Sequence, residues 1–182
     1  MKELLVVSVC KEKLHELEFV DPVTDILQGA DINFFVRHYS KIKKEDLIHS
    51  NKIIICGTSL QDNNFVEDIK SFGWLKSFKK PVLGICAGMQ ILGLIFGGKI
   101  DDKGEVGFYF ENFKKEFLGL NGKKEVYHLH NRYVSGWGRD WEVFAEGNEI
   151  VQAVKHREKD LYGVLFHPEV RNKKTILEFV KE

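Results

Sequence analysis

Short runs of apolar residues recur along the first half of the chain, and segments with helix-like spacing separate them. The runs predict strands at residues 4–9, 32–36 and 52–56, and a fourth strand that opens at Pro81. Runs of this length that are apolar on both faces are typical of strands inside a parallel sheet. The alternation of strand and helix therefore predicts an α/β fold of three layers, with a mainly parallel sheet and helices on both faces.

The predicted helices have their own start signals and apolar faces. Asp21 and Pro22 suit the N-cap and first position of a helix, and Gly29 suits the residue just past its end. Apolar side chains at helical spacing, which we interpret as core, mark a helix at about residues 64–78: Phe65, Ile69, Phe72 and Leu75. Shorter helices are predicted at residues 43–48, 89–96 and 173–181. Residues 13–20 fit either an early helical turn or a loop.

The second half of the chain has a different pattern, with shorter strand-like pieces and frequent turn signals. Strands are predicted at about residues 106–110, 125–129, 141–145, 150–155 and 161–166. Turn residues such as Asn121-Gly122 and Gly147-Asn148 separate them. This pattern predicts antiparallel strands that extend the parallel sheet. No repeat or linker divides the chain, so residues 1–182 are expected to form a single domain.

Composition and charge narrow the classes of function. The 182 residues are 43% hydrophobic and 30% charged with a net charge of zero, which gives no electrostatic signature for nucleic acid or an anionic membrane. Three cysteines in a chain this long do not suggest a disulfide framework. No signal peptide and no apolar run of membrane length are visible. We therefore expect a cytoplasmic protein that binds neither nucleic acid nor membrane.

The first candidate for chemistry is the turn that follows the strand opening at Pro81. Cys86 stands between Gly84 and Gly88, and an apolar run with helix potential follows. A strand, a sharp turn and a helix in this order are typical of a nucleophile elbow, in which a helix N-terminus favours the thiolate. Side chains at the two glycines would crowd so tight a turn. The alternative is an inert, buried cysteine, and the elbow alone does not decide between them.

The second candidate is the pair His167 and Glu169, which follows the last predicted strand. The two residues lie on the same side of an extended chain, and Pro168 between them suits a strand end. Glu169 can then orient the imidazole while its other nitrogen faces a thiol, which is the logic of a catalytic triad. A surface ion pair is the alternative for this pair alone. The elbow and the pair together are much more specific than either.

Both motifs resemble those of the class I glutamine amidotransferases, the triad type. The segments that carry the resemblance are Gly84-Ile-Cys-Ala-Gly-Met-Gln90 and Tyr162-Gly-Val-Leu-Phe-His-Pro-Glu169. The resemblance covers essentially the whole chain and implies a flavodoxin-like glutaminase domain over residues 1–182. It implies Cys86, His167 and Glu169 as catalytic residues, no cofactor, glutamine as substrate, and a separate synthase subunit that receives the ammonia.

The resemblance also implies an oxyanion hole. The elbow supplies one backbone donor from Ala87, and the family places the second at Gly57-Thr58, in the loop after the third strand. This loop is usually glycine-rich and ends in proline, whereas the chain has Gly-Thr-Ser. A backbone donor does not depend on the side chain, so activity is expected to survive, although a non-glycine residue can prevent a backbone flip.

Residues that contact the substrate follow from the resemblance in the same way. Gln90 lies one helical turn after Cys86, and Asn131 and Arg132 lie in a segment resembling the one that holds the amino-acid end of glutamine. His128 and His130 alternate with Tyr127 and Leu129 along the preceding strand. A metal site would need further ligands at suitable spacing, and none is evident. A structural or substrate-orienting role for these histidines is therefore favoured, and no metal is expected.

Several alternatives stay open at this point. Residues 104–107 and 150–170 resemble the glutaminase subunit of GMP synthase, the Met89-Gln90 pair equally resembles that of imidazole glycerol phosphate synthase, and residues 13–22 match neither. The chain then belongs to one of these or to an orphan branch. A γ-glutamyl hydrolase on the same fold is a second possibility. A regulatory binding protein without glutaminase activity is a third, which the intact triad argues against.

Overall fold

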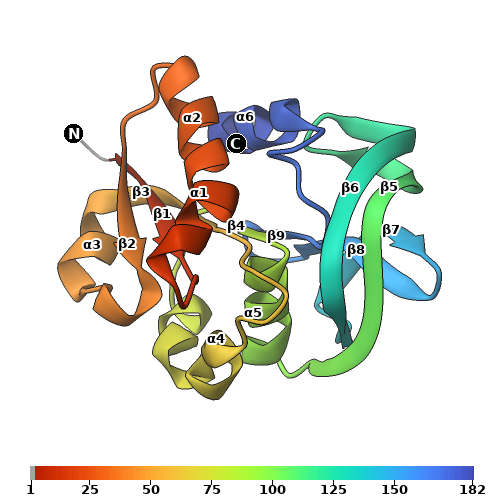
Figure 1. The fold of residues 1–182 in the computed structure, drawn as a ribbon, viewed down its shortest axis with the longest axis horizontal. Helices are drawn as coiled ribbons and strands as arrows, with labels where there is room; N and C mark the ends of the chain where they lie inside the picture. The colour runs from red at the N-terminus through yellow and green to blue at the C-terminus, as the bar shows by residue number, and fades with distance from the viewer. Residues whose placement is uncertain (1–2) are drawn as a thin grey trace.

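Residues 3–182 are described by a computed structural model, and their strands form one twisted sheet (Figure 1). The nine strands lie in the order β2-β1-β3-β4-β9-β8-β7-β5-β6. Their bounds are β1 Glu3–Ser8, β2 Phe34–His38, β3 Ser50–Ile55, β4 Val82–Ile85, β5 Lys99–Phe117, β6 Leu120–Ser135, β7 Trp141–Gly147, β8 Ile150–His156 and β9 Leu161–Val164.

The sheet has a parallel half and an antiparallel half. Strands β2, β1, β3, β4 and β9 run parallel, while β8, β7, β5 and β6 continue the sheet with antiparallel pairing. The predicted mainly parallel sheet with an antiparallel extension is therefore confirmed. The placement of residues 161–166 in that extension is wrong, because β9 lies at the centre and pairs parallel with β4 and antiparallel with β8. All four β9 residues are buried, as expected of a central strand.

Helices cover both faces of the sheet, as the alternation of elements predicts. The α-helices are α1 Glu16–Phe19, α2 Asp21–Gly29, α3 Lys44–His49, α4 Asn64–Glu67, α5 Ala87–Ile95 and α6 Lys173–Lys181. Short 3-10 helices lie at η1 Lys13–His15, η2 Tyr39–Lys41 and η3 Ile69–Lys76. Helices α1, α2 and α6 pack on one face, and η3 and α5 on the other (Figure 1). None of the helices within residues 3–182 is long and apolar enough to cross a membrane.

The structure refines two of the helix predictions. Residues 13–20, which fit either a helical turn or a loop, form η1 and α1. The single helix predicted over residues 64–78 is instead divided into α4 and η3, because Asp68 between them leaves the helical conformation (φ −91°, ψ 19°). The hydroxyl of Tyr39 donates a hydrogen bond to the Asp68 carboxylate (2.7 Å) and holds it at the break. Phe72 and Leu75 are buried as predicted.

Strands β5 and β6 form one long curved hairpin, where the sequence predicted only short pieces (Figure 1). Much of β5 is solvent-exposed, so its ends are rich in charged residues and lack the apolar alternation of a half-buried strand. The hairpin nevertheless brings β6 to the helix α5, since β6 packs against α5 at the carboxyl edge of the parallel strands.

The turn between β4 and α5 has no space for side chains at its two glycines. A Cβ atom at Gly84 would lie 2.5 Å from the backbone carbonyl atoms of Gly88, and a Cβ atom at Gly88 would collide with the carbonyl oxygen of Ile55. This supports the sequence argument that both positions require glycine. The helix α5 is therefore packed directly against the backbone of β3 and β4.

We predict that Gly88→Ala destabilises the fold because its new methyl group collides with rigid backbone. The expected loss is roughly 1–3 kcal/mol in the free energy of unfolding, measured by urea denaturation. Gly29→Ala is the matched control: a Cβ there meets nothing within 4 Å, and alanine in a helix should stabilise by roughly 0.5–1 kcal/mol. Equal stability of the two variants would contradict this account of the turn.

Candidate active site

Cys86 lies at the tip of the turn between β4 and α5, in a backbone conformation that few residues adopt. Its φ is 49° and its ψ is −102°, a strained combination for any residue with a side chain. Its backbone N–H donates to the carbonyl of Val164 on β9 (2.8 Å), which fixes the turn to the centre of the sheet. The thiol is buried and points at the carbonyl oxygen of Leu129 on β6 (3.6 Å). The N-terminus of α5 begins directly behind it.

His167 and Glu169 lie just beyond the end of β9 and are almost fully buried. Nδ1 of His167 donates to Oε1 of Glu169 over 2.6 Å. The backbone N–H of His167 donates to the carbonyl of Tyr127 on β6 (2.8 Å). Since Glu169 occupies Nδ1, the other ring nitrogen, Nε2, is free to act on a second group.

The Cys86 thiol lies near this imidazole. Nε2 of His167 is buried without a conventional hydrogen bond within residues 3–182, yet Cys86 lies close enough to interact with it. Burial disfavours a charge on His167, but the Glu169 carboxylate and the Cys86 sulfur together raise its pKa well above the ordinary value. The structure therefore brings Cys86, His167 and Glu169 into one chain of interactions.

Two contacts that the sequence did not predict hold the imidazole in place. The ring of Phe19 from α1 packs on it at 5.7 Å between centroids. On another side lies Gly57, where a Cβ atom would approach Cε1 of His167 to 2.7 Å. Phe19 belongs to the segment that resembles neither of the two synthase glutaminases, so no motif signalled this role.

A small pocket opens beside Cys86 and contains about 260 Å³ of empty space. Its lining includes Ala87 and Gln90 from α5, Thr58 from the loop after β3, and Asn131 from β6; the remaining lining residues are Ser59, Leu60, Asp62, Asn63, Phe65, Cys86, Leu129 and His130. Four of the residues predicted to contact substrate or oxyanion thus line one cavity with the cysteine.

Arg132 is placed differently from the other predicted contacts. Its side chain donates to Asp102 (3.1 Å) and Asn63 (2.8 Å) and is not part of the pocket lining. Its backbone carbonyl accepts a hydrogen bond from Gln90 (3.0 Å), which orients that amide. Asn131 in turn donates to the carbonyl of Leu60 (3.0 Å) across the pocket. The predicted side-chain role is therefore supported by position for Gln90 and Asn131 but not for Arg132.

The loop that contains Gly57 and Thr58 is tied down by a buried carboxylate. One oxygen of Asp62 accepts hydrogen bonds from the Thr58 hydroxyl (2.8 Å) and the Lys11 N–H (3.0 Å), and it contacts Nδ1 of His15 (2.9 Å). Burial opposes the charge on Asp62, but these interactions outweigh it and lower its pKa. The loop is thereby joined to the segment 11–15, a contact that the separation in sequence had concealed.

The other two cysteines are less suited to nucleophilic chemistry. Cys10 and Cys56 are both buried, and burial raises the pKa of each thiol. Neither precedes an α-helix as Cys86 does, and the nearby Glu169 carboxylate adds to the rise in the pKa of Cys56. Cys86 is therefore the best suited of the described cysteines.

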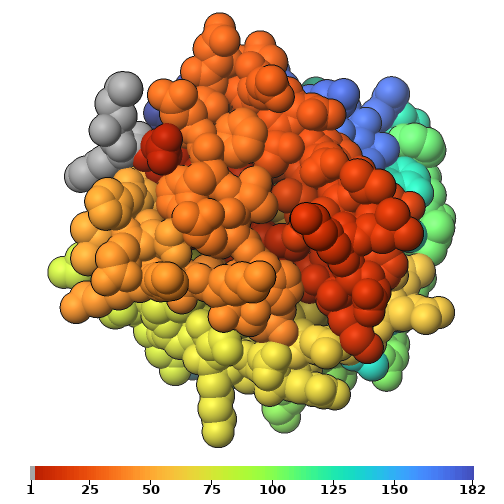
Figure 2. Space-filling view, turned by 60° about the vertical axis from the view of Figure 1, so that its left-hand side comes forward, coloured from red at the N-terminus to blue at the C-terminus, as the bar shows by residue number. Residues whose placement is uncertain are grey.

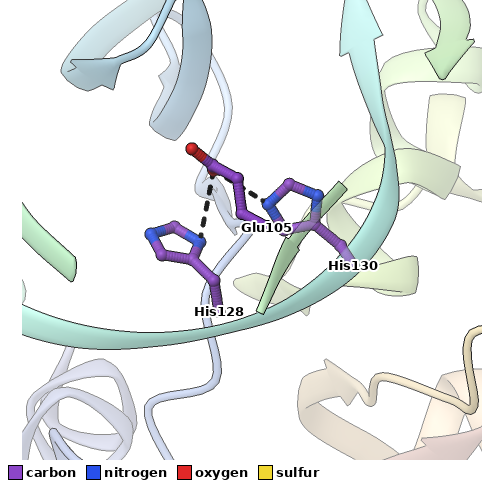
Figure 3. A group of neighbouring side chains, drawn as sticks. All are labelled: Glu105, His128 and His130. Atoms are coloured by element: carbon purple, nitrogen blue, oxygen red, sulfur yellow. Dashed lines mark hydrogen bonds and ion pairs between the residues drawn. The ribbon is translucent and has the colours of Figure 1, made fainter. Parts of the chain in front are cut away.

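A second group of polar side chains lies behind the pocket wall (Figure 3). His128 and His130 of β6 point at Glu105 of β5, and all three are buried. The sequence showed no carboxylate at suitable spacing, because Glu105 is brought to the histidines only by the pairing of β5 with β6. Burial and the nearby His128 lower the pKa of His130 to about 4, so its imidazole is neutral.

Comparison with known proteins agrees with the motifs. The family model of glutamine amidotransferase class-I matches residues 23–181. A subunit of the glutamine-hydrolysing GMP synthase from Methanobrevibacter smithii is 38% identical over 105 residues, covering 54% of this chain and 55% of that protein. A glutamine-hydrolysing GMP synthase from Francisella philomiragia is 34% identical over 186 residues, covering 94% of this chain and 36% of that protein. The chain thus spans about half of the length of the Methanobrevibacter protein and about a third of the length of the Francisella protein.

The fold has close relatives among solved structures. A Thermoplasma acidophilum protein provisionally assigned as a subunit of GMP synthase superposes with a TM-score of 0.87 at 21% identity, covering 100% of this chain and 93% of that one. At this identity the match establishes the fold. The fold predicted from the two motifs is therefore confirmed by this superposition, and the predicted family by the family model. The predicted likeness to the glutaminase of GMP synthase agrees with the names of the two relatives.

We predict that Glu169→Gln lowers the pKa of His167, because it removes the negative charge that favours the imidazolium. A pH titration of labelled histidine side chains by NMR would measure the shift. Because the folded-state pKa lies above the unfolded value of about 6.5, this charge stabilises the fold fully below that pH. The contribution is lost as the pH rises through the folded-state pKa.

The control for this titration is Glu178→Gln, which removes a half-buried carboxylate of α6 that pairs with Lys181. Its His167 should titrate as in the unmodified chain. An unchanged or higher pKa of His167 in Glu169→Gln would show that the carboxylate does not set the charge of the imidazole.

Proposed function

The chain belongs to the class I glutamine amidotransferase family, a family of enzymes, and we propose that it hydrolyses the side-chain amide of glutamine with Cys86 as nucleophile. The observation that carries the proposal is the strained turn that presents Cys86 to the buried pair of His167 and Glu169. A backbone strained in this way persists only where the surrounding structure holds it. Residues 1–182 would act as one glutaminase domain.

The proposed reaction has two steps. His167 takes the proton of the Cys86 thiol and the sulfur attacks the amide carbon. The C–N bond then breaks as His167 gives that proton to the departing ammonia, which leaves a glutamyl thioester. Water then attacks the thioester carbon while His167 takes its proton, the C–S bond breaks, and glutamate leaves. Glu169 keeps the imidazole in the tautomer that directs Nε2 at the sulfur. Glutamine and water are consumed, and glutamate and ammonia are formed.

The oxyanion of each tetrahedral intermediate would be stabilised by backbone donors at Ala87 and in the Gly57-Thr58 loop. Ala87 is the first residue of α5, so its N–H is not used within the helix. The Thr58 hydroxyl is held by Asp62 (2.8 Å). This bond restrains the loop and compensates for the glycine that relatives in the family usually have there.

The pocket favours free glutamine over longer γ-glutamyl substrates. The side chain of Asn131 donates a hydrogen bond to the carbonyl of Leu60 across the pocket (3.0 Å), which restricts the space beyond Cys86. Gln90 and Asn131 would contact the amino-acid end of glutamine, while Arg132 would act through its backbone carbonyl and its bonds to Asp102 and Asn63. A γ-glutamyl hydrolase needs room beyond the γ-carbonyl, so it is the second candidate.

We also propose that a separate synthase subunit receives the ammonia. The relative from Methanobrevibacter smithii is itself one subunit of a GMP synthase, and no nucleotide-binding motif is visible in this chain. Such an enzyme would act in the cytoplasm without a cofactor of its own, and nothing in its charge favours nucleic acid or membranes.

An exposed apolar strip offers a surface for that synthase. Val106, Phe108 and Phe110 of β5 are each about 60% exposed and share one face, because they alternate along the strand. Val170, just after Glu169, is also exposed. Tyr127 packs on Phe108 from β6, the strand that also lines the pocket. A partner on this strip would lie close to the site where ammonia is released.

Among the described residues, the opposite side of the molecule carries no comparable strip. Figure 2 shows the side formed by the N-terminal third of the chain, coloured red to orange, where η1, α1, α2 and α3 lie at the surface. The large apolar side chains exposed there, Leu14, Leu17 and Ile48, do not alternate along a strand. This contrast favours the β5 face as the docking surface.

We predict that the purified chain releases glutamate from glutamine, and that Cys86→Ala lowers the rate by at least about 1,000-fold because no other group can form the thioester. An enzymatic assay of glutamate measures it. Cys10→Ser is a control for a general effect of removing a thiol, and it should keep most of the activity because the serine hydroxyl can still donate to the Gly57 carbonyl.

A chain that is silent alone can still be tested with a glutamine-like electrophile that modifies the active-site thiol. Mass spectrometry should find the label on Cys86 and not on Cys10 or Cys56. If Cys86 neither reacts with the electrophile nor supports turnover in the presence of a synthase, the proposed glutaminase is wrong.

We predict that Phe110→Asp weakens binding to the synthase subunit of the same organism by at least about tenfold, because it places a charge in the apolar strip. Calorimetry with the two purified subunits measures the affinity. Ile48→Asp, an equally exposed apolar position on α3, is the matched control and should bind normally. Equal affinity of both variants would remove β5 from the interface while leaving the glutaminase proposal intact.

A further inference from the structure

The buried cluster behind the pocket wall has the geometry of a metal site. Nε2 of His130 lies 3.2 Å from Oε2 of Glu105, and Nδ1 of His128 lies 3.8 Å from the same oxygen. The three ligand atoms all lie within 4.8 Å of one another. Bonds of about 2.0–2.1 Å from a tetrahedral ion would separate its ligands by about 3.3 Å. An ion can therefore bind between these atoms with only small movements.

The hydrogen bonds of His128 direct one bare nitrogen into the cluster. Its Nε2 donates to Oε1 of Glu111 over 3.2 Å, which fixes the proton on that nitrogen. Its Nδ1 then carries a lone pair. This nitrogen is fully buried and has no hydrogen-bond partner within residues 3–182. Figure 3 shows this nitrogen and the ring of His130 converging on the Glu105 carboxylate. An ion between these atoms would pair with the bare Nδ1 of His128 and would take the place of the proton in the contact between Nε2 of His130 and Glu105.

The charges point the same way. Glu105 and Glu111 are both buried, and within residues 3–182 their ionic contacts go to the two histidines. Buried carboxylates are costly unless they are paired, and a divalent cation held between the ligand atoms would pair with the shared Glu105 carboxylate.

Hydrogen bonds support two of the three candidate ligands, His128 and Glu105, whereas Nδ1 of His130 has no partner within residues 3–182. Metal-bound histidines commonly donate their second nitrogen to a carboxylate, as His128 does to Glu111. The Glu105 carboxylate is held by Asn148 (2.8 Å) and by Gln152 (2.8 Å). The side-chain oxygen of Gln152, Oε1, is buried and accepts no hydrogen bond within the described residues. It is a further oxygen near the cluster that a metal-bound water could reach.

We propose that Glu105, His128 and His130 form a binding site for a divalent transition-metal ion, with Zn²⁺ as the preferred ion. Two imidazole nitrogens and one carboxylate oxygen suit zinc, and a water completes its four ligands. The ion joins β5 to β6 directly behind Leu129 and Asn131, which line the pocket. Its role is structural: it fixes the strand that accepts the Cys86 and His167 hydrogen bonds.

The test uses the Cys86→Ala chain, so that zinc cannot bind to the thiol and His167 instead. Calorimetry with Zn²⁺ on chelator-treated protein should give one ion per chain, and zinc should raise the thermal midpoint. Glu105→Gln should weaken binding at least about 100-fold, and Glu111→Gln about 10–100-fold because it removes the support of His128. His156→Ala replaces a buried histidine outside the cluster and should bind zinc like the parent.

Substitution with Co²⁺ identifies the ligands without relying on any variant. With Co²⁺ bound, the unmodified chain should show the visible absorption of a tetrahedral cobalt site. It should show no charge-transfer band of a thiolate ligand. Zinc binding that survives in Glu105→Gln, or that requires Cys86, would place the ion elsewhere. No binding by the folded chain at micromolar zinc would overturn the proposal and leave a purely hydrogen-bonded cluster.

Discussion

The contact of α5 with the backbone of β3 and β4 is the constraint on which the rest of the site depends. Gly84 and Gly88 allow the first turn of the helix to approach the strands so closely that no other residue fits. The chain must then reverse within one residue, and Cys86 takes the strained conformation that results (φ 49°). The thiol is thereby placed at the start of a helix whose axis is fixed by the sheet.

Two backbone hydrogen bonds extend this constraint to the other parts of the site. The N–H of Cys86 donates to the carbonyl of Val164, and the N–H of His167 donates to the carbonyl of Tyr127. The first joins the turn to β9, and the second joins the end of β9 to the hairpin strand β6. Because backbone groups make these bonds, side-chain variation in the strands leaves them intact. The positions of the imidazole and the thiol are consequently determined by the turn at Cys86, by β9 and by β6, which meet at one sheet edge.

Local sequence pattern was enough to predict part of the molecule, and it failed where distant residues meet. Apolar runs and glycine spacing were enough for strands β1 to β4 and the turn at Cys86, but not for the parallel pairing of β9 with β4. The spacing of His167 and Glu169 in an extended chain was enough for their proximity. These patterns could not reveal that Asp62 binds Thr58 and His15, or that Arg132 turns to Asp102 and Asn63. The long hairpin was missed for a related reason, because a mostly exposed strand needs no apolar alternation.

The same hairpin explains why one element serves three purposes. Strand β6 lines the pocket through Leu129, His130 and Asn131, and the side chains of His128 and His130 contact Glu105. The neighbouring strand β5 exposes Phe108 and Phe110 to solvent. A strand has only two faces, so any change that shifts its register moves the pocket wall and the polar cluster together. An interaction that holds Glu105, His128 and His130 in place therefore also holds the β6 residues that line the pocket. This is a physical role for a buried His–Glu cluster beside the pocket.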